Sequence, residues 1–128
     1  MSTISVLLVD DDRDIREALC EVLEMEGYKV ATAENGQVAI NYLKQCPQNE
    51  RPCVILLDLA MPVMNGAEFL AHIHMNYKAE FGDIPVIVAS ANLNTDPIVL
   101  KHSKARLKKP IDLDKLLETV KLHCGKSN

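Results

Sequence analysis

Short apolar runs alternate along the chain with stretches in which apolar residues recur every three or four positions. Consecutive apolar residues are typical of strands buried on both faces of a parallel sheet, whereas the wider spacing is typical of amphipathic helices. Regular alternation of the two patterns indicates βαβ units. We predict five strands, at residues 4–9, 28–33, 54–57, 85–90 and 105–108. We predict five helices, at residues 15–23, 38–43 and 67–73, from Pro97, and at residues 112–123.

Turn and capping residues separate these segments. Asp12 is placed to cap the first helix, and Gly27 is placed to end it. Pro62 and the pair Asn65 and Gly66 predict a turn-rich loop after the third strand. Loops are also predicted at residues 45–52 and 81–84.

The length and composition fit one compact domain. With 128 residues and 48% hydrophobic residues, the chain can bury an ordinary core, so we expect one domain over residues 1–128 and no output domain. Three aspartates follow the first apolar run, which argues against a signal peptide or a membrane span and favours the cytoplasm. The cysteines form no C-x-x-C pair, so reduced thiols are expected rather than a zinc site. They are Cys20, Cys46, Cys53 and Cys124.

Polar residues lie where the predicted strands end. Asp10 and Asp11 follow the first strand, and Asp58 follows the apolar run of the third. Ser90 ends the fourth strand and Lys109 follows the fifth. The carboxyl ends of parallel strands share one edge of the sheet, where ligands bind in open α/β folds. We therefore expect one pocket with three carboxylates, a hydroxyl and an ammonium group.

Such a pocket needs a cation. Two like charges about 4 Å apart repel by roughly 4 kcal/mol at an effective dielectric constant near 20, so three carboxylates require a cation or raised pKa values. Carboxylate oxygens suit Mg²⁺, which commonly partners a phosphate. Carboxylates, Mg²⁺ and a lysine together indicate phosphoryl transfer.

Four segments carry a family resemblance over nearly the whole chain: L-L-V-D-D-D, L-L-D-L-A-M-P-V-M-N-G, V-I-V-A-S-A and L-K-K-P. In this order and spacing they closely resemble the receiver domain of two-component response regulators. The resemblance implies a flavodoxin-like (βα)5 three-layer α/β sandwich with a five-stranded parallel sheet of order 2-1-3-4-5. It implies that Asp58 accepts a phosphoryl group from a histidine kinase or phosphotransfer protein, and that the bond between Lys109 and Pro110 is often cis.

The resemblance also implies roles for the other pocket residues. Asp11 would contact Mg²⁺ directly and Asp10 through water, while Asp58 and the carbonyl of Ala60 would be further ligands. Lys109 would pair with the phosphoryl oxygens. Ser90 would move to hydrogen-bond those oxygens in the active state. The chain would then be a signalling domain rather than an enzyme.

Two features depart from the family pattern and concern how the signal leaves the domain. Arg106 stands where an aromatic residue often switches, and the interval from Ser90 to Lys109 is about one helical turn short, so a stunted fourth helix is expected. In this family partners read the face made by the fourth helix, fifth strand and fifth helix. We predict that phosphorylation orders residues 91–104 through Ser90, without an aromatic rotamer change.

Charge indicates the kind of partner. Residues 101–109 hold five basic residues and no acidic one, so the formal net charge of −4 divides into +5 there and −9 elsewhere. Overall acidity and the lack of a recognition fold argue against direct nucleic-acid binding, and we expect a protein partner with an acidic patch.

Two alternatives from other classes remain open. A Mg²⁺-dependent phosphatase with an aspartyl nucleophile, similar to haloacid dehalogenases, would need a second aspartate two positions after Asp58, where Ala60 stands. A phosphorylation-independent adaptor would not need the complete pocket.

The histidines and methionines are not expected to form a separate site. The four histidines are expected to face solvent, and Met61 and Met64 are expected to pack in the loop.

Overall fold

A computed structural model of the chain describes residues 5–91 and 96–124. Its strands are β1 (Ser5–Val9), β2 (Lys29–Ala33), β3 (Val54–Asp58), β4 (Val86–Ser90) and β5 (Ala105–Lys108). Its helices are α1 (Arg13–Met25), α2 (Gly36–Gln45), the 3-10 turn η1 (Gln48–Glu50), α3 (Gly66–Asn76), α4 (Lys78–Phe81), α5 (Pro97–His102) and α6 (Leu113–Cys124).

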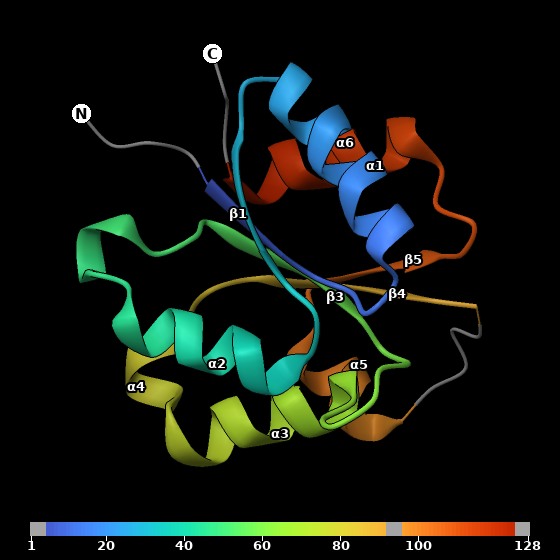
Figure 1. Cartoon of the computed structure of the whole chain (residues 1–128). Helices are drawn as coiled ribbons and strands as arrows, with labels where there is room; N and C mark the ends of the chain where they lie inside the picture. The colour runs from blue at the N-terminus through green and yellow to red at the C-terminus, as the bar shows by residue number, and fades with distance from the viewer. Residues whose placement is uncertain (1–4, 92–95, 125–128) are drawn as a thin grey trace.

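The five strands form one parallel sheet of order β2-β1-β3-β4-β5. Figure 1 shows α1 and α6 on one face of the sheet and α2 to α5 on the other, which makes three layers. This confirms the predicted flavodoxin-like architecture. The central strands β1 and β3 are buried along their whole length, because helices cover both of their faces.

Two apolar clusters hold the layers together. One joins the sheet to α2 and α3 through buried residues such as Ile40, Phe69 and Leu70. The other joins the opposite face to α1 and α6 through Leu19 and Leu116. Met61 is buried in the first cluster and Met64 packs against it, which confirms the packing role predicted for both.

The predicted caps and the short helix are confirmed. Asp12 caps α1 by accepting from the backbone N–H groups of the next turn. Gly27 follows that helix at φ +93°, a left-handed conformation that favours glycine. The helix that begins at Pro97 spans only six residues.

The structure adds two short helical turns in predicted loops. The turn α4 overlaps the predicted loop 81–84 at Phe81, and η1 lies within the predicted loop 45–52. The connection between α3 and β4 therefore breaks the strict alternation of five strands and five helices. Of the four residues of α4, only Phe81 is buried, so the sequence offered too few apolar positions to show a helical period.

The prediction of four reduced thiols was wrong. Cys53 and Cys124 are joined by a disulfide, with Cα atoms 5.2 Å apart, whereas Cys20 and Cys46 are free. The pair is separated by 71 residues, so no local motif in the sequence could reveal it.

The prediction of four solvent-facing histidines was also wrong. His74 of α3 and His102 of α5 are half-buried and stack with ring centroids 3.5 Å apart. The fold brings together two helices that are far apart in the sequence. Among the described residues, no helix is both long and apolar enough to cross a membrane.

Candidate functional site

The end of β1 fixes Asp10 in the interior. Its backbone N–H donates to the carbonyl of Ala33, and its carbonyl accepts from the Arg16 guanidinium at 2.8 Å. The carboxylate Oδ1 accepts from the Asp12 backbone N–H at 2.9 Å. Asp10 is only 3% exposed, whereas the neighbouring Asp11 is exposed. Three hydrogen bonds therefore hold Asp10 in place.

The end of β3 fixes Asp58 in the same way. Asp58 is 4% exposed, and its Oδ1 accepts from the backbone N–H of Ala60 at 3.2 Å. The following loop returns to the strand, because the Gly66 N–H donates to the Leu59 carbonyl at 3.0 Å. A Cβ on Gly66 would lie 2.6 Å from Leu59 Cδ2 and 2.9 Å from the Asp58 carbonyl oxygen, so the close return requires glycine.

Lys109 brings its ammonium group to the two buried carboxylates. Its Nζ lies 2.9 Å from Asp58 Oδ1 and 3.7 Å from Asp10 Oδ2. Its backbone N–H donates to the Ser90 carbonyl at 2.9 Å, which ties the end of β5 to the end of β4. The peptide bond between Lys109 and Pro110 is cis, as predicted.

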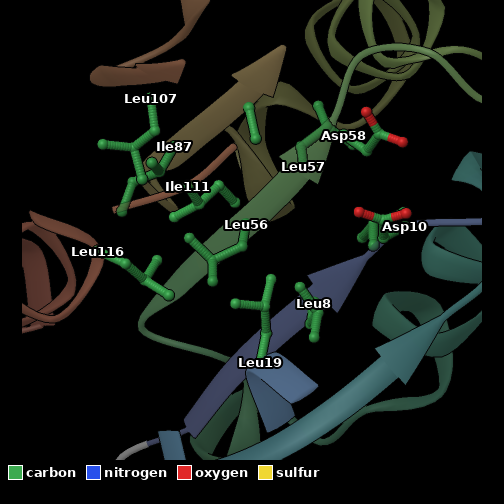
Figure 2. A pocket seen from close by; sticks show the side chains of 12 residues that line it. Leu8, Asp10, Leu19, Leu56, Leu57, Asp58, Ile87, Leu107, Ile111 and Leu116 are labelled. Carbon is green, nitrogen blue, oxygen red and sulfur yellow. The ribbon is translucent and has the colours of Figure 1, made fainter. Parts of the chain in front are cut away.

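The third carboxylate completes an acidic cluster. One oxygen from each of Asp10, Asp11 and Asp58 lies within 4.8 Å of the others. Figure 2 shows the Asp10 and Asp58 carboxylates facing one another at the ends of their strands, above apolar side chains that include Leu8 and Leu56. The Lys109 ammonium group therefore faces a cluster of three carboxylates, and its single positive charge is too small to balance them.

The electrostatics of the pocket follow from burial and charge. Burial raises the pKa of the Asp58 carboxyl; the hydrogen bond from Lys109 opposes this rise, and the charge of Asp10 adds to it. Burial alone would lower the pKa of Lys109, but its hydrogen bond to Asp58 and the surrounding carboxylates raise it. Lys109 therefore stays charged at neutral pH. Any further cation in the pocket would stabilise the ionised form of Asp58.

The donor set fits Mg²⁺. Three carboxylates supply hard oxygen ligands, and two of them are held rigidly by their backbone hydrogen bonds. Asp11 is exposed, so the cluster is open to solvent on one side. That opening leaves room for the several waters that Mg²⁺ usually keeps.

The structure thus brings together four of the predicted site residues: Asp10, Asp11, Asp58 and Lys109. Ser90 is the last residue of β4 and lies next to Ala89, which pairs with Asp58 in the sheet. Ala60 is exposed and lies in the loop that follows Asp58.

Sequence reasoning missed three supports of the site. Arg16 holds the Asp10 backbone, and only the fold reveals this contact. Asn65 and Glu68 form a capping box at the start of α3, and their N-x-x-E spacing was a visible signal. Gly66, predicted as a turn residue, begins α3 and allows the loop to approach Leu59.

Comparison with known proteins identifies the family. The family model described as the response regulator receiver domain matches residues 6–121. The protein PilH of Pseudomonas aeruginosa strain PAO1 is 36% identical over 118 residues, which cover 90% of this chain and 93% of PilH. Sporulation initiation phosphotransferase F of Bacillus subtilis strain 168 is 32% identical over 128 residues, with 94% of each chain covered.

Solved structures agree with the family match. The response regulator TrrA of Thermotoga maritima, solved in complex with Mg(2+)-BeF, has a TM-score of 0.79 and 30% identity, covering 94% of this chain and 98% of TrrA. A response regulator receiver protein from Pseudomonas putida has a TM-score of 0.82 and 28% identity, covering 95% and 98%. This chain belongs to the response regulator receiver domain family of two-component systems.

Proposed function

We propose that Asp58 accepts a phosphoryl group from a phosphohistidine of a histidine kinase or phosphotransfer protein, and that this modification controls the binding of a downstream partner. One observation carries the proposal. Asp58 is a buried carboxylate at the end of the central strand, 2.9 Å from the Lys109 ammonium and within 4.8 Å of oxygens from Asp10 and Asp11. Receiver domains interact with histidine kinases and phosphotransfer proteins, which supports the choice of donor.

The transfer requires little chemistry from the protein beyond positioning and charge. An oxygen of Asp58 attacks phosphorus, the phosphorus–nitrogen bond breaks, and its electron pair returns to the imidazole nitrogen of the donor. Lys109, already at the Asp58 carboxylate, is placed to pair with the phosphoryl oxygens. Mg²⁺ bound by Asp10, Asp11, Asp58 and the Ala60 carbonyl would supply further positive charge for these oxygens.

An apolar groove beside Lys109 supports docking of the donor at this edge. A phosphohistidine must reach Asp58, so the protein that carries it must cover the surface next to the pocket. The groove offers such a surface, because α1 and the segment around the cis proline expose apolar side chains there. Its lining residues are Ile15, Ala18, Leu19, Ala91, Lys109, Pro110 and Ile111.

The output would leave through α5, β5 and α6. Ser90 connects the pocket to the segment 91–104, of which residues 92–95 lie outside the described residues. Arg106 and Lys108 are exposed on β5, and Lys101 is exposed on α5, so this face suits an acidic partner. A single-domain chain and a cytoplasmic location stay predictions.

Phosphorylation with a small donor tests the proposal. Acetyl phosphate and Mg²⁺ should add one phosphoryl group to the wild-type chain, as read by intact mass, and none to Asp58→Asn. Asp12→Asn is the matched control, because Asp12 caps α1 outside the carboxylate cluster and asparagine caps about as well. An adaptor would gain no phosphoryl group as the wild type or as Asp12→Asn. A phosphatase would consume the donor without accumulating a phosphorylated chain.

A further inference from the structure

The disulfide joins the end of the last helix to the start of the central strand. Cys53 directly precedes β3, and its backbone N–H donates to the Ser5 carbonyl at 2.9 Å, so it is fixed to the sheet. Cys124 is the last residue of α6. Because Cys53 directly precedes β3 and Asp58 ends it, the disulfide and the phosphoacceptor pocket lie at opposite ends of that strand.

The last turn of α6 has little else to hold it. Leu116 and Val120 of α6 are fully buried against the sheet, but Leu122, within the last turn, is 77% exposed. Among the described residues, Val120 is the last residue of α6 with a buried side chain. The bond to Cys53 therefore attaches a turn that apolar packing leaves weakly held.

Neither cysteine of the disulfide is fully enclosed by the core. Cys53 and Cys124 are half-buried at the border of the cluster under α6. The remaining thiols lie elsewhere: Cys20 on α1 and Cys46 at the end of α2. Burial and the neighbouring Glu24 raise the pKa of the Cys20 thiol, which makes it a poor competitor in thiol exchange.

We propose that Cys53 and Cys124 form a reversible redox site that clamps the last turn of α6 to the sheet. A small disulfide such as oxidised glutathione closes the site in two exchanges. One cysteine thiolate attacks the glutathione disulfide, which gives a mixed disulfide and releases one glutathione. The other cysteine attacks the protein-bound sulfur and releases the second glutathione. Two protein thiols are thereby oxidised and one glutathione disulfide is reduced to two thiols.

The clamp predicts a coupling between folding and the disulfide. The native fold holds the two Cα atoms 5.2 Å apart, whereas the unfolded chain must close a loop of 71 residues. The quantity to compare is the squared concentration of reduced glutathione divided by the concentration of oxidised glutathione, taken at the point where half of the pair is reduced. This quantity should be about a hundredfold or more higher for the native protein than for the protein in concentrated urea. Alkylation of free thiols followed by intact mass measures both ratios.

Hydrogen exchange tests the structural consequence. Reduction should speed amide exchange in residues 121–124 by about tenfold or more and leave residues 54–58 unchanged. Cys53→Ser should show the fast exchange under both oxidising and reducing conditions. The double variant Cys20→Ser and Cys46→Ser is the matched control and should respond as the wild type does.

Three results would overturn the proposal. The first is equal glutathione ratios for the native and urea-unfolded protein. The second is exchange in residues 121–124 that does not differ between the oxidised and reduced wild type. The third is a stable mixed disulfide with glutathione on the native chain in place of the Cys53 to Cys124 bond. None of these results depends on whether Asp58 accepts a phosphoryl group.

Discussion

Replacing Lys109 by methionine should destabilise the metal-free domain, and bound Mg²⁺ should restore much of the lost stability. The methionine side chain keeps much of the apolar stem of lysine and removes the ammonium group. Asp58 and Asp10, which are 4% and 3% exposed, would then face each other without their cationic partner.

The structure sets the size of this effect. At an effective dielectric constant near 20, the 2.9 Å contact to Asp58 contributes about 6 kcal/mol of Coulomb attraction and the 3.7 Å contact to Asp10 about 4 kcal/mol. Desolvation offsets most of this, and removing one partner of a buried pair typically costs about 3–5 kcal/mol. Without Lys109, Asp58 can take up a proton in place of remaining charged. Protonating a carboxyl of ordinary pKa at pH 7 costs about 4 kcal/mol, and this cost is an upper limit on the loss of stability. Because the Lys109 side chain is 24% exposed, we expect a loss near the lower end, about 3 kcal/mol.

Urea unfolding with a chelator, and again with saturating Mg²⁺, measures this loss. Mg²⁺ at about a hundred times the variant's dissociation constant should stabilise Lys109→Met by about 2.7 kcal/mol, which offsets most of its loss relative to the metal-free wild type. Lys108→Met is the control, because Lys108 is exposed and should change the free energy of unfolding by less than about 0.5 kcal/mol. If Lys109→Met matched the wild type in chelator, the ammonium group would not be what balances the carboxylates.

Three further predictions concern the cluster, the loop and the histidine pair. Asp11→Asn should reduce the Mg²⁺-dependent rise in melting temperature, and an unchanged rise would reject Asp11 as a ligand. Gly66→Ala should cost about 1–3 kcal/mol in urea unfolding, because its Cβ would lie 2.8 Å from Leu59 Cα; no loss would show that the loop relaxes. Burial and nearby cationic side chains lower the pKa of His74 and His102. The unfolded chain therefore binds more protons, and the free energy of unfolding should fall as pH drops below about 6.5. His102→Gln should flatten this dependence, and an unaltered pH profile would contradict the assignment.

The apolar pattern predicted the parallel sheet and the pocket for one physical reason, whereas the strand order followed from the family resemblance. Consecutive apolar residues mark strands that are covered on both faces, and helices between them force the strands to run parallel. Parallel strands end at the same edge, so the polar residue after each apolar run belongs to one pocket. Asp58 and Lys109 are 51 positions apart, yet this rule alone placed them in the same pocket.

The features that were missed depend on contacts that no local pattern records. Cys53 meets Cys124 only because α6 returns across the sheet to the start of β3. His74 meets His102 only because the short helix α5 packs against α3. The contact of Arg16 with the Asp10 carbonyl likewise depends on how α1 lies against the end of β1.

Mapping the phosphorylated residue tests the central claim most directly. Borohydride reduces an acyl phosphate to an alcohol, so a phosphorylated aspartate is converted to homoserine and can be located in a digest by mass spectrometry. After treatment with acetyl phosphate and Mg²⁺, homoserine should appear at Asp58 and at no other aspartate. It should be lost when a chelator replaces Mg²⁺. Homoserine at Asp10, at Asp11 or outside the cluster, or an unmodified Asp58 in a folded chain that binds Mg²⁺, would contradict the account.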